Sequence, residues 1–223
     1  MKKIITIAAA CMISAAAFGQ VKFGVKAGFN TSRLTELNTI GLSQDNATML
    51  FNDKNSSTGF HVGAYANYSF SKTLGAQAEL LFSTQGGSSV GLFSPQDGRF
   101  EKQTQRLSFI NLPLLLDIKP FERPFSVLVG PQLSVCVNRS FSHKEWYGSD
   151  VNYNDFDAAI VLGAQYTFFK HLAVGLRYNV GLIPSTQFNY EYFYKPENTD
   201  KFQKVASLRQ TNNMLQLSVG WTF

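Results

Sequence analysis

The chain has 223 residues, of which 44% are hydrophobic and 14% aromatic, enough for one domain of moderate size. The formal net charge is +5 and falls by two when Lys2 and Lys3 are assigned to an export signal at residues 1–19. No basic cluster is present, so nucleic acid is not an expected partner. Cys11 also lies in that signal, which leaves Cys136 without a disulfide partner and excludes an oxidised framework.

The N-terminal segment predicts secretion. Lys2 and Lys3 precede the apolar run 4–18, and small residues follow at the position that a signal peptidase recognises. The mature domain is then expected at residues 20–223. The run is shorter than the roughly 20 residues of a membrane-spanning helix, and no later segment is long enough. Cys11 leaves a lipoprotein signal open as an alternative.

The mature chain alternates between apolar and polar residues in segment after segment, which is the period of a two-sided β-strand. The first of these segments carries Val21, Phe23 and Val25 on one face and Lys22, Gly24 and Lys26 on the other. Eight segments show the pattern: 21–29, 60–70, 74–82, 110–118, 125–129, 156–168, 172–182 and 215–223. The sequence therefore predicts eight strands.

The connections between these strands are short and long in turn. The short ones are 71–73, 120–123 and 169–171, and the long ones are 34–57, 87–104, 139–154 and 184–210. In a meander, this places all short turns at one end and all long loops at the other. The pattern predicts an all-β fold, an eight-stranded antiparallel up-and-down transmembrane β-barrel with short periplasmic turns and long extracellular loops.

Alternation alone also fits a soluble ligand carrier, whose apolar face would point inward. Three features favour the opposite orientation, with lipid outside. The apolar face carries essentially no charged residue, whereas the polar face holds most of the glycines, which suit the crowded inside of a narrow barrel. In addition, aromatic residues fall at two levels that predict the interfacial girdles of a membrane barrel: Phe23, Tyr68, Phe70, Phe125, Tyr166, Phe168, Trp221 and Phe223 at the turn end, and Phe29, Phe60, Phe82 and Phe156 toward the loops.

Two prolines interrupt neighbouring strands and fall nearly opposite each other, Pro113 and Pro131. Because each removes a donor from the ladder of hydrogen bonds, we expect a bulge or a local widening of this hairpin.

Several local patterns, taken in order, resemble the PorT-like outer-membrane β-barrel family of Bacteroidota over nearly the whole mature chain. They are the segments 23–30, 78–86, 109–116, 129–131, 156–157 and 177–182, followed by the terminal aromatic. The sequence departs from the family at Asp117 and at Thr84-Gln85. The resemblance implies an integral eight-stranded barrel of the outer membrane, mostly without an assigned activity. PorT itself is associated with a secretion machinery, a role that membership alone does not transfer.

The inward face carries a few charged residues. Glu79 and Arg177 each lie five residues from the start of their strands, and those strands are the third and seventh, on opposite sides of an eight-stranded barrel. A bridge between them is expected, with Asp157 higher in the same lumen network; the alternative is that each charge meets local water. Such a lumen is plugged. A water-filled pore needs about 16 strands, so a narrow channel for small solutes remains only an alternative.

Enzymatic chemistry is not expected. No serine pairs with any of the three histidines, so no catalytic residue, metal site or cofactor is predicted. His61 is expected to serve as a hydrogen-bonding group in the lumen. A lipid-modifying enzyme would need an apolar slot, whereas Leu81, Leu115, Leu128 and Met214 appear isolated among polar neighbours.

The remaining signals lie in the loops and at the C-terminus. Aromatic residues that could form a surface for sugars or proteins are Trp146, Tyr147, Tyr190, Tyr192 and Tyr194. Alternatively, the three tyrosines simply extend the seventh strand above the bilayer.

Trp221 and Phe223 share a lipid-facing stripe and suit the terminal signal read by the outer-membrane barrel assembly machinery. The sequence thus predicts a lipid-embedded protein of the cell outer membrane with a structural or surface-interaction role. A component of a secretion or assembly complex is the further alternative.

Overall fold

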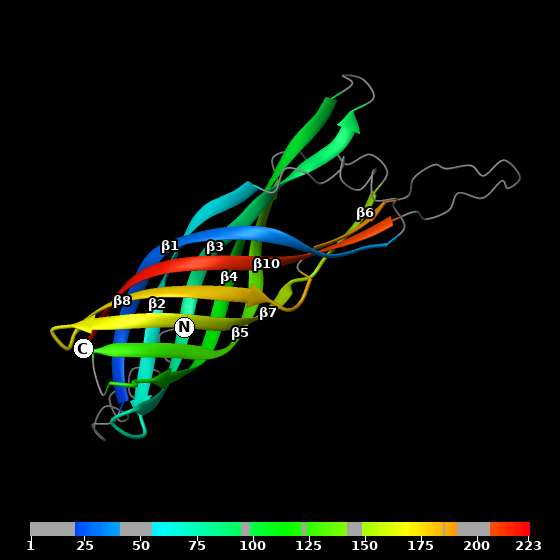
Figure 1. Cartoon of the computed structure of the whole chain (residues 1–223). Coiled ribbons are helices and arrows are strands. Elements are labelled where there is room, and N and C mark those ends of the chain that lie inside the picture. The colour runs from blue at the N-terminus through cyan, green and yellow to red at the C-terminus, as the bar shows by residue number, and fades with distance from the viewer. Residues whose placement is uncertain are drawn as a thin grey trace, which may run out of the picture.

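The computed structural model describes residues 21–40, 55–94, 99–121, 124–141, 149–184, 186–190 and 206–223 (Figure 1). These residues form ten strands: β1 (Val21–Ile40), β2 (Asn55–Ser69), β3 (Leu74–Ser94), β4 (Arg99–Ile118), β5 (Phe125–Phe141), β6 (Ser149–Tyr153), β7 (Phe156–Phe168), β8 (Leu172–Gly181), β9 (Thr186–Tyr190) and β10 (Ala206–Thr222). Within the same ranges, no helix is long and apolar enough to cross a membrane.

Eight of the strands close into an antiparallel barrel in the order β1, β2, β3, β4, β5, β7, β8, β10. Pairing between β1 and β10 completes the ring and runs from Gly24 opposite Thr222 to Ile40 opposite Ser207. Closure leaves the barrel wall without an open edge, so its backbone groups can be satisfied in hydrocarbon. The predicted fold class is confirmed.

The strands run further than the alternation indicated, because several continue into the segments expected to be long loops. β3 and β4 form a hairpin that extends to Ser94 and Arg99, although the expected loop was 87–104. β6 and β9 lie beyond the barrel and pair with each other, and β9 also pairs with β10. The sequence there is polar at most positions, and above the bilayer water can solvate either face, so the period-two signal is lost while pairing persists.

The extracellular rim divides into two projecting sheets. Pairing of β1 with β2 ends at Ser32 and Ser57, while β1 continues along β10 to Ile40. On the far side, pairing of β5 with β7 ends at Val135 and Phe156, while β5 continues along β4. In Figure 1, the β3–β4 hairpin and the sheet of β1, β10, β9 and β6 therefore project in different directions.

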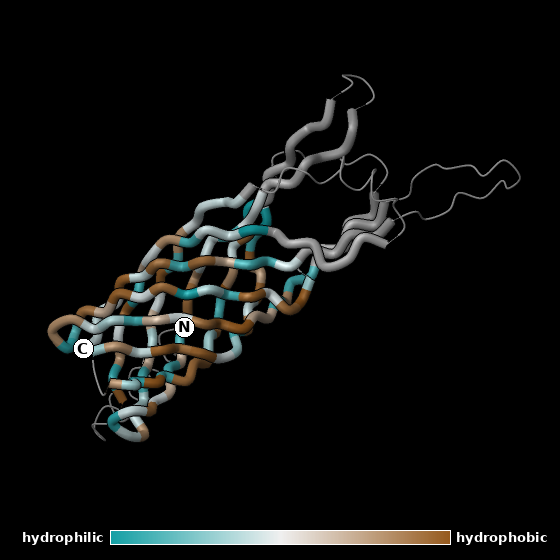
Figure 2. Tube along the Cα trace, viewed as in Figure 1, coloured by the Kyte–Doolittle hydropathy of each residue, from teal (hydrophilic) through white to brown (hydrophobic). Residues whose placement is uncertain are grey.

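The two faces of the wall have the polarity that lipid requires. Apolar side chains point outward and are highly exposed, as Phe29 (75%), Leu80 (59%) and Leu162 (58%) show. The alternate positions point inward and include most of the buried polar residues, so hydrophobic and hydrophilic positions alternate along each strand in Figure 2. This agrees with the orientation predicted from the sequence.

Aromatic side chains contact one another at both levels of the outer wall. The contacts between ring centroids are Tyr68 to Phe70 (5.1 Å) and Tyr166 to Phe168 (4.6 Å) at the turn end, with His171 stacked on Trp221 at 5.5 Å, and Phe60 to Phe82 (6.1 Å) toward the loops. Aromatic rings at these two levels suit the membrane interfaces.

The bulge expected at the two prolines is absent from that position. Pro113 faces the lumen opposite Gln132, and the register there is the same as at Leu116 and Val129 further along the hairpin. Between these pairs, Leu114 and Leu115 have no ladder partner on β5, so the ladder is interrupted beside Pro131 without a change of register. The strands also stay close, because a Cβ on Gly130 would lie 2.1 Å from the Leu114 carbonyl oxygen. The irregularity of this pair lies instead between Ser108 and Phe109, toward the extracellular end.

Close approach of backbone explains one of the inward glycines. At Gly28, an added Cβ would lie 2.0 Å from the Leu217 carbonyl oxygen and 2.6 Å from the His61 ring. At Gly175, the nearest atom is the Ser218 hydroxyl at 3.1 Å, which belongs to a side chain that can rotate. The two positions thus form a matched pair, in which only the first is closed to a side chain.

We predict that Gly28→Ala lowers the free energy of unfolding by about 1 to 3 kcal/mol, the usual cost of overpacking, whereas Gly175→Ala causes a smaller loss. Urea unfolding of the purified barrels in detergent, followed by heat-modifiable gel migration, measures both. Equal stability of the two variants would contradict the close approach at Gly28.

Candidate functional site

The centre of the lumen is a buried ion cluster around Glu79. Arg177 Nη1 donates to Glu79 Oε2 at 2.8 Å, and Arg177 Nη2 donates to Oε1 at 2.7 Å, so the contact is bidentate. The two side chains are only 2% and 0% exposed. The pair spans the barrel from β3 to β8, as expected from their equal depth on opposed strands.

Lys26 on β1 completes the cluster, a contact that was not expected from the sequence. Its Nζ donates to Glu79 Oε1 at 2.8 Å. Gly63 on β2 and Gly220 on β10 lie directly opposite Lys26, and neither has a side chain to block it. The inward position of Lys26 was readable from alternation, but its reach to Glu79 depends on these neighbours.

Arg177 is accommodated in a similar way. A Cβ on Gly163, which faces Arg177 from β7, would lie 2.5 Å from the Arg177 Cγ atom. The arginine stem therefore occupies the space that this glycine leaves. Two cations now share one carboxylate, so the cluster of Lys26, Glu79 and Arg177 carries one net positive charge.

A chain of hydrogen bonds links the cluster to the periplasmic end. Gln77 donates to Glu79 Oε1, and its own oxygen accepts from Asn67 at 3.2 Å. Asn67 also donates to Asp117 Oδ2 at 2.9 Å, and the same carboxylate oxygen pairs with Lys119 at 2.6 Å. Asp117, where the sequence departs from the PorT-like pattern, is thus a paired lumen residue.

The extracellular half of the lumen is filled by neutral polar groups. His61 Nδ1 and Asn30 Oδ1 lie 2.6 Å apart, and Asn30 also donates to the Thr84 carbonyl at 2.8 Å. Gln132 bridges further, donating to Asn111 at 3.3 Å and accepting from Asn179 at 3.2 Å. These contacts place His61 in the hydrogen-bonding position that the sequence predicted.

Asp157 does not join Glu79 and Arg177. It faces the lumen on β7 and is only 6% exposed, opposite Ser134 of β5. Within the described residues, its Oδ1 atom has no hydrogen-bond partner. The structure therefore brings together two of the three acidic and basic residues expected in one network and leaves the third apart.

Part of the lumen wall is apolar, contrary to the expectation that its leucines are isolated. Leu115, Leu128 and Val161, from β4, β5 and β7, form a buried cluster with exposures of 0 to 2%. Leu107 and Phe109 also point inward and are each 1% exposed. This cluster was not expected from the sequence, because its three residues belong to three different strands and meet only across them.

The terminal residues lie on the lipid-facing side at the turn end. Trp221 is 48% and Phe223 73% exposed, and the Phe223 amide donates to the Phe23 carbonyl at 2.9 Å. Of the loop aromatics, only the backbone of Tyr190, at the end of β9, is described. The other four, Trp146, Tyr147, Tyr192 and Tyr194, lie outside the described residues.

Among the described residues, no group of three histidine, cysteine or acidic side chains gathers as metal ligands would. The lumen instead combines the Glu79 cluster and the Asp117–Lys119 ion pair with neutral amides and a leucine-rich wall. Its geometry suits filling and bracing of a narrow barrel.

A closed, eight-stranded wall with apolar residues outside and a polar lumen defines an integral membrane β-barrel. The family model for the outer membrane protein beta-barrel domain matches residues 14–187, and the chain belongs to this family. It is therefore a protein of the outer membrane. No curated protein matches the chain in sequence.

Several solved structures of outer-membrane proteins are similar to this chain in backbone fold. OprG of Pseudomonas aeruginosa is 14% identical, with 91% of this chain and 95% of OprG covered and a TM-score of 0.48. Neisserial surface protein A is 13% identical, with coverage of 90% and 97% and a TM-score of 0.44. Ail of Yersinia pestis is 11% identical, with coverage of 92% and 99% and a TM-score of 0.41.

We predict that Glu79→Gln is the most destabilising change in the ion cluster. It leaves Lys26 and Arg177 buried without a counter-charge and lowers the free energy of unfolding by about 3 to 5 kcal/mol. Lys26→Gln keeps the bidentate pair and costs less, about 1.5 to 3 kcal/mol. Urea titration in detergent gives both values.

Lys72, in the exposed turn between β2 and β3, supplies the control. Lys72→Gln should change the stability by less than about 0.5 kcal/mol. A Glu79→Gln barrel as stable as Lys72→Gln would show that the cluster does not brace the wall.

Proposed function

We propose that this barrel keeps its lumen closed and serves as a structural or surface-interaction protein of the outer membrane. The observation that supports this most directly is the Glu79 cluster, whose three side chains span the lumen and are at most 3% exposed. Eight strands enclose a space that side chains can fill, whereas aqueous channels need about 16.

The extracellular strands support a role at the surface. From Ser32 to Ile40, β1 runs beyond its last pair with β2, roughly 25 Å at about 3.3 Å per residue. β3 and β4 project as a second sheet. The proposed contact surface is formed by the loop aromatics: Trp146 and Tyr147 follow β5 in the sequence, Tyr190 ends β9, and Tyr192 and Tyr194 follow it.

Conductance distinguishes a closed barrel from a narrow channel. Purified wild-type protein in a planar bilayer is expected to give no stepwise current. Glu79→Ala leaves two like charges in the lumen, which repel each other and draw in water and anions, so brief anion-selective openings are expected.

Lys72→Ala, in the exposed turn, should stay as silent as the wild type. A steady current through the wild-type barrel would instead favour the narrow channel. Recovery of a fixed set of partners when the protein is purified from gently solubilised membranes would favour a component of a secretion or assembly complex, the role that the PorT-like resemblance raises.

The barrel assembly machinery is a proposed partner of the C-terminal strand. Deleting Phe223 removes an exposed aromatic and one hydrogen bond to Phe23 while leaving the lumen contacts unchanged. We expect a severalfold lower yield of folded barrel in the outer membrane, measured by heat-modifiable migration, with Thr222→Ser as the control. Normal insertion of the shortened chain would argue against this signal.

A further inference from the structure

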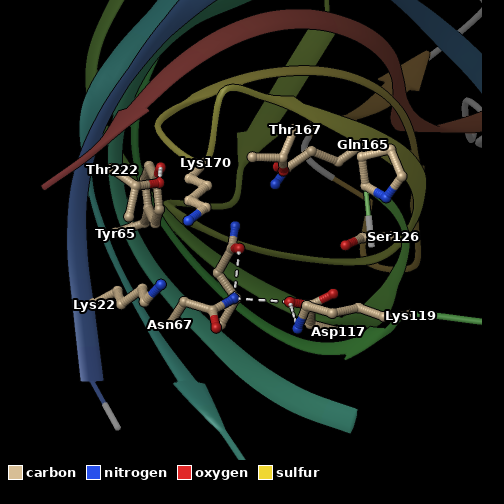
Figure 3. A pocket seen from close by; sticks show the side chains of 12 residues that line it. Lys22, Tyr65, Asn67, Asp117, Lys119, Ser126, Gln165, Thr167, Lys170 and Thr222 are labelled. Carbon is tan, nitrogen blue, oxygen red and sulfur yellow. Dashed lines mark hydrogen bonds and ion pairs between the residues drawn. The ribbon is translucent and has the colours of Figure 1, made fainter. Parts of the chain in front are cut away.

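The periplasmic mouth of the barrel contains a pocket that the closed lumen does not use. Its cavity measures about 50 Å³, and twelve side chains from several strands line it (Figure 3). Three of these are lysines, Lys22 on β1, Lys119 just after β4 and Lys170 in the turn between β7 and β8. The one acidic residue among the twelve is Asp117, so the lining carries a formal charge of +2.

The negative charge of Asp117 is already engaged. Lys119 pairs with its Oδ2 at 2.6 Å, and Asn67 donates to the same oxygen at 2.9 Å. The ammonium groups of Lys22 and Lys170 reach into the mouth from different sides (Figure 3). Their positive field is concentrated by the barrel wall around them, because low-dielectric walls focus field lines.

The floor of the pocket does not offset this charge. Gln77 forms part of the lining and donates to Glu79, but that carboxylate is held between Lys26 and Arg177. The ion cluster behind Gln77 therefore adds one positive charge. The rest of the lining supplies neutral hydrogen-bonding groups, among them Gln165 and Thr167.

Lys170 is held over the mouth by a strained turn. Phe169 and Lys170 have φ angles of 50° and 67°, and the His171 amide donates to the Phe168 carbonyl at 3.2 Å. These are the features of a two-residue hairpin turn of type I′, which favours asparagine and glycine. Glycine would relieve the strain at this position, so the turn holds a lysine at the mouth at some cost in stability.

We propose that this pocket, lined by Lys22, Lys119 and Lys170, binds a single phosphate group from the periplasmic side. Lysine binds phosphate as a point charge, without the planar geometry that arginine matches to carboxylates. The small cavity suits one tetrahedral oxyanion. The phosphate could be free or belong to a lipid headgroup of the inner leaflet.

The two strained residues provide a matched test. Lys170→Gly and Phe169→Gly both relieve the turn, so both should raise the urea midpoint of unfolding. In titrations of folded protein with inorganic phosphate at low salt in dodecyl maltoside, only Lys170→Gly should weaken binding, by about fivefold, the effect of one unit charge near 4 Å in water-like surroundings. Phe169→Gly and Lys72→Gln should bind as the wild type does.

Asp117→Asn tests the sign of the effect, because it raises the charge of the lining and should tighten phosphate binding. Absence of saturable binding to the wild type, or equal affinity of Lys170→Gly and Phe169→Gly, would overturn the proposal. Micelles doped with phosphatidic acid identify the source. Displacement of inorganic phosphate by this lipid, and not by diacylglycerol, assigns the site to a headgroup, and lack of displacement assigns it to free phosphate.

Discussion

The structure depends on one constraint, the need to satisfy every backbone amide and carbonyl within hydrocarbon. Pairing of β1 with β10 meets it by closing the ring at eight strands. Closure at this number makes the lumen narrow, and strand alternation then sends half of all side chains into it. Inward residues must therefore be small or find partners inside. The glycines opposite Lys26 and Arg177 are examples of small inward residues. The ion cluster that these two cations form with Glu79 is an example of large inward residues that find partners.

What the sequence could predict follows from how local each signal is. Alternation and turn length are properties of single segments, so the eight strands, the outward apolar face and the aromatic levels could be predicted. The Glu79 to Arg177 pair could also be predicted, because opposed strands in an eight-stranded ring and equal depth leave few other partners. Contacts that depend on the register between strands could not be predicted. The reach of Lys26 to Glu79, and the meeting of Leu115, Leu128 and Val161, depend on registers that no single strand encodes.

The polarity of the lumen is uneven around the ring. Leu115, Leu128 and Val161 line one wall, on β4, β5 and β7, while the ion cluster draws its residues from β1, β3 and β8. The apolar cluster offers no hydrogen-bond partners at its own level, but the same three strands carry buried polar residues above and below it, among them Asn111, Asp117 and Gln132. Pro113 on β4 keeps its place opposite Gln132, so the register across the hairpin is unchanged although the proline lacks an amide donor.

In the proposed closed barrel, the lumen separates the two ends chemically. The bidentate contact of Arg177 with Glu79 fixes both side chains, and Lys26 and Gln77 both donate to the Oε1 atom of the same carboxylate. Although Gln77, Asn67 and Asp117 connect the periplasmic mouth to this cluster, breaking the cluster would leave buried charges without partners, a cost of several kcal/mol. The proposed anion would contact none of the three cluster side chains, which do not line the pocket, so its binding does not distinguish an intact cluster from a broken one. If the lumen stays closed as proposed, the projecting extracellular sheets and the basic mouth act independently, each on its own side of the membrane.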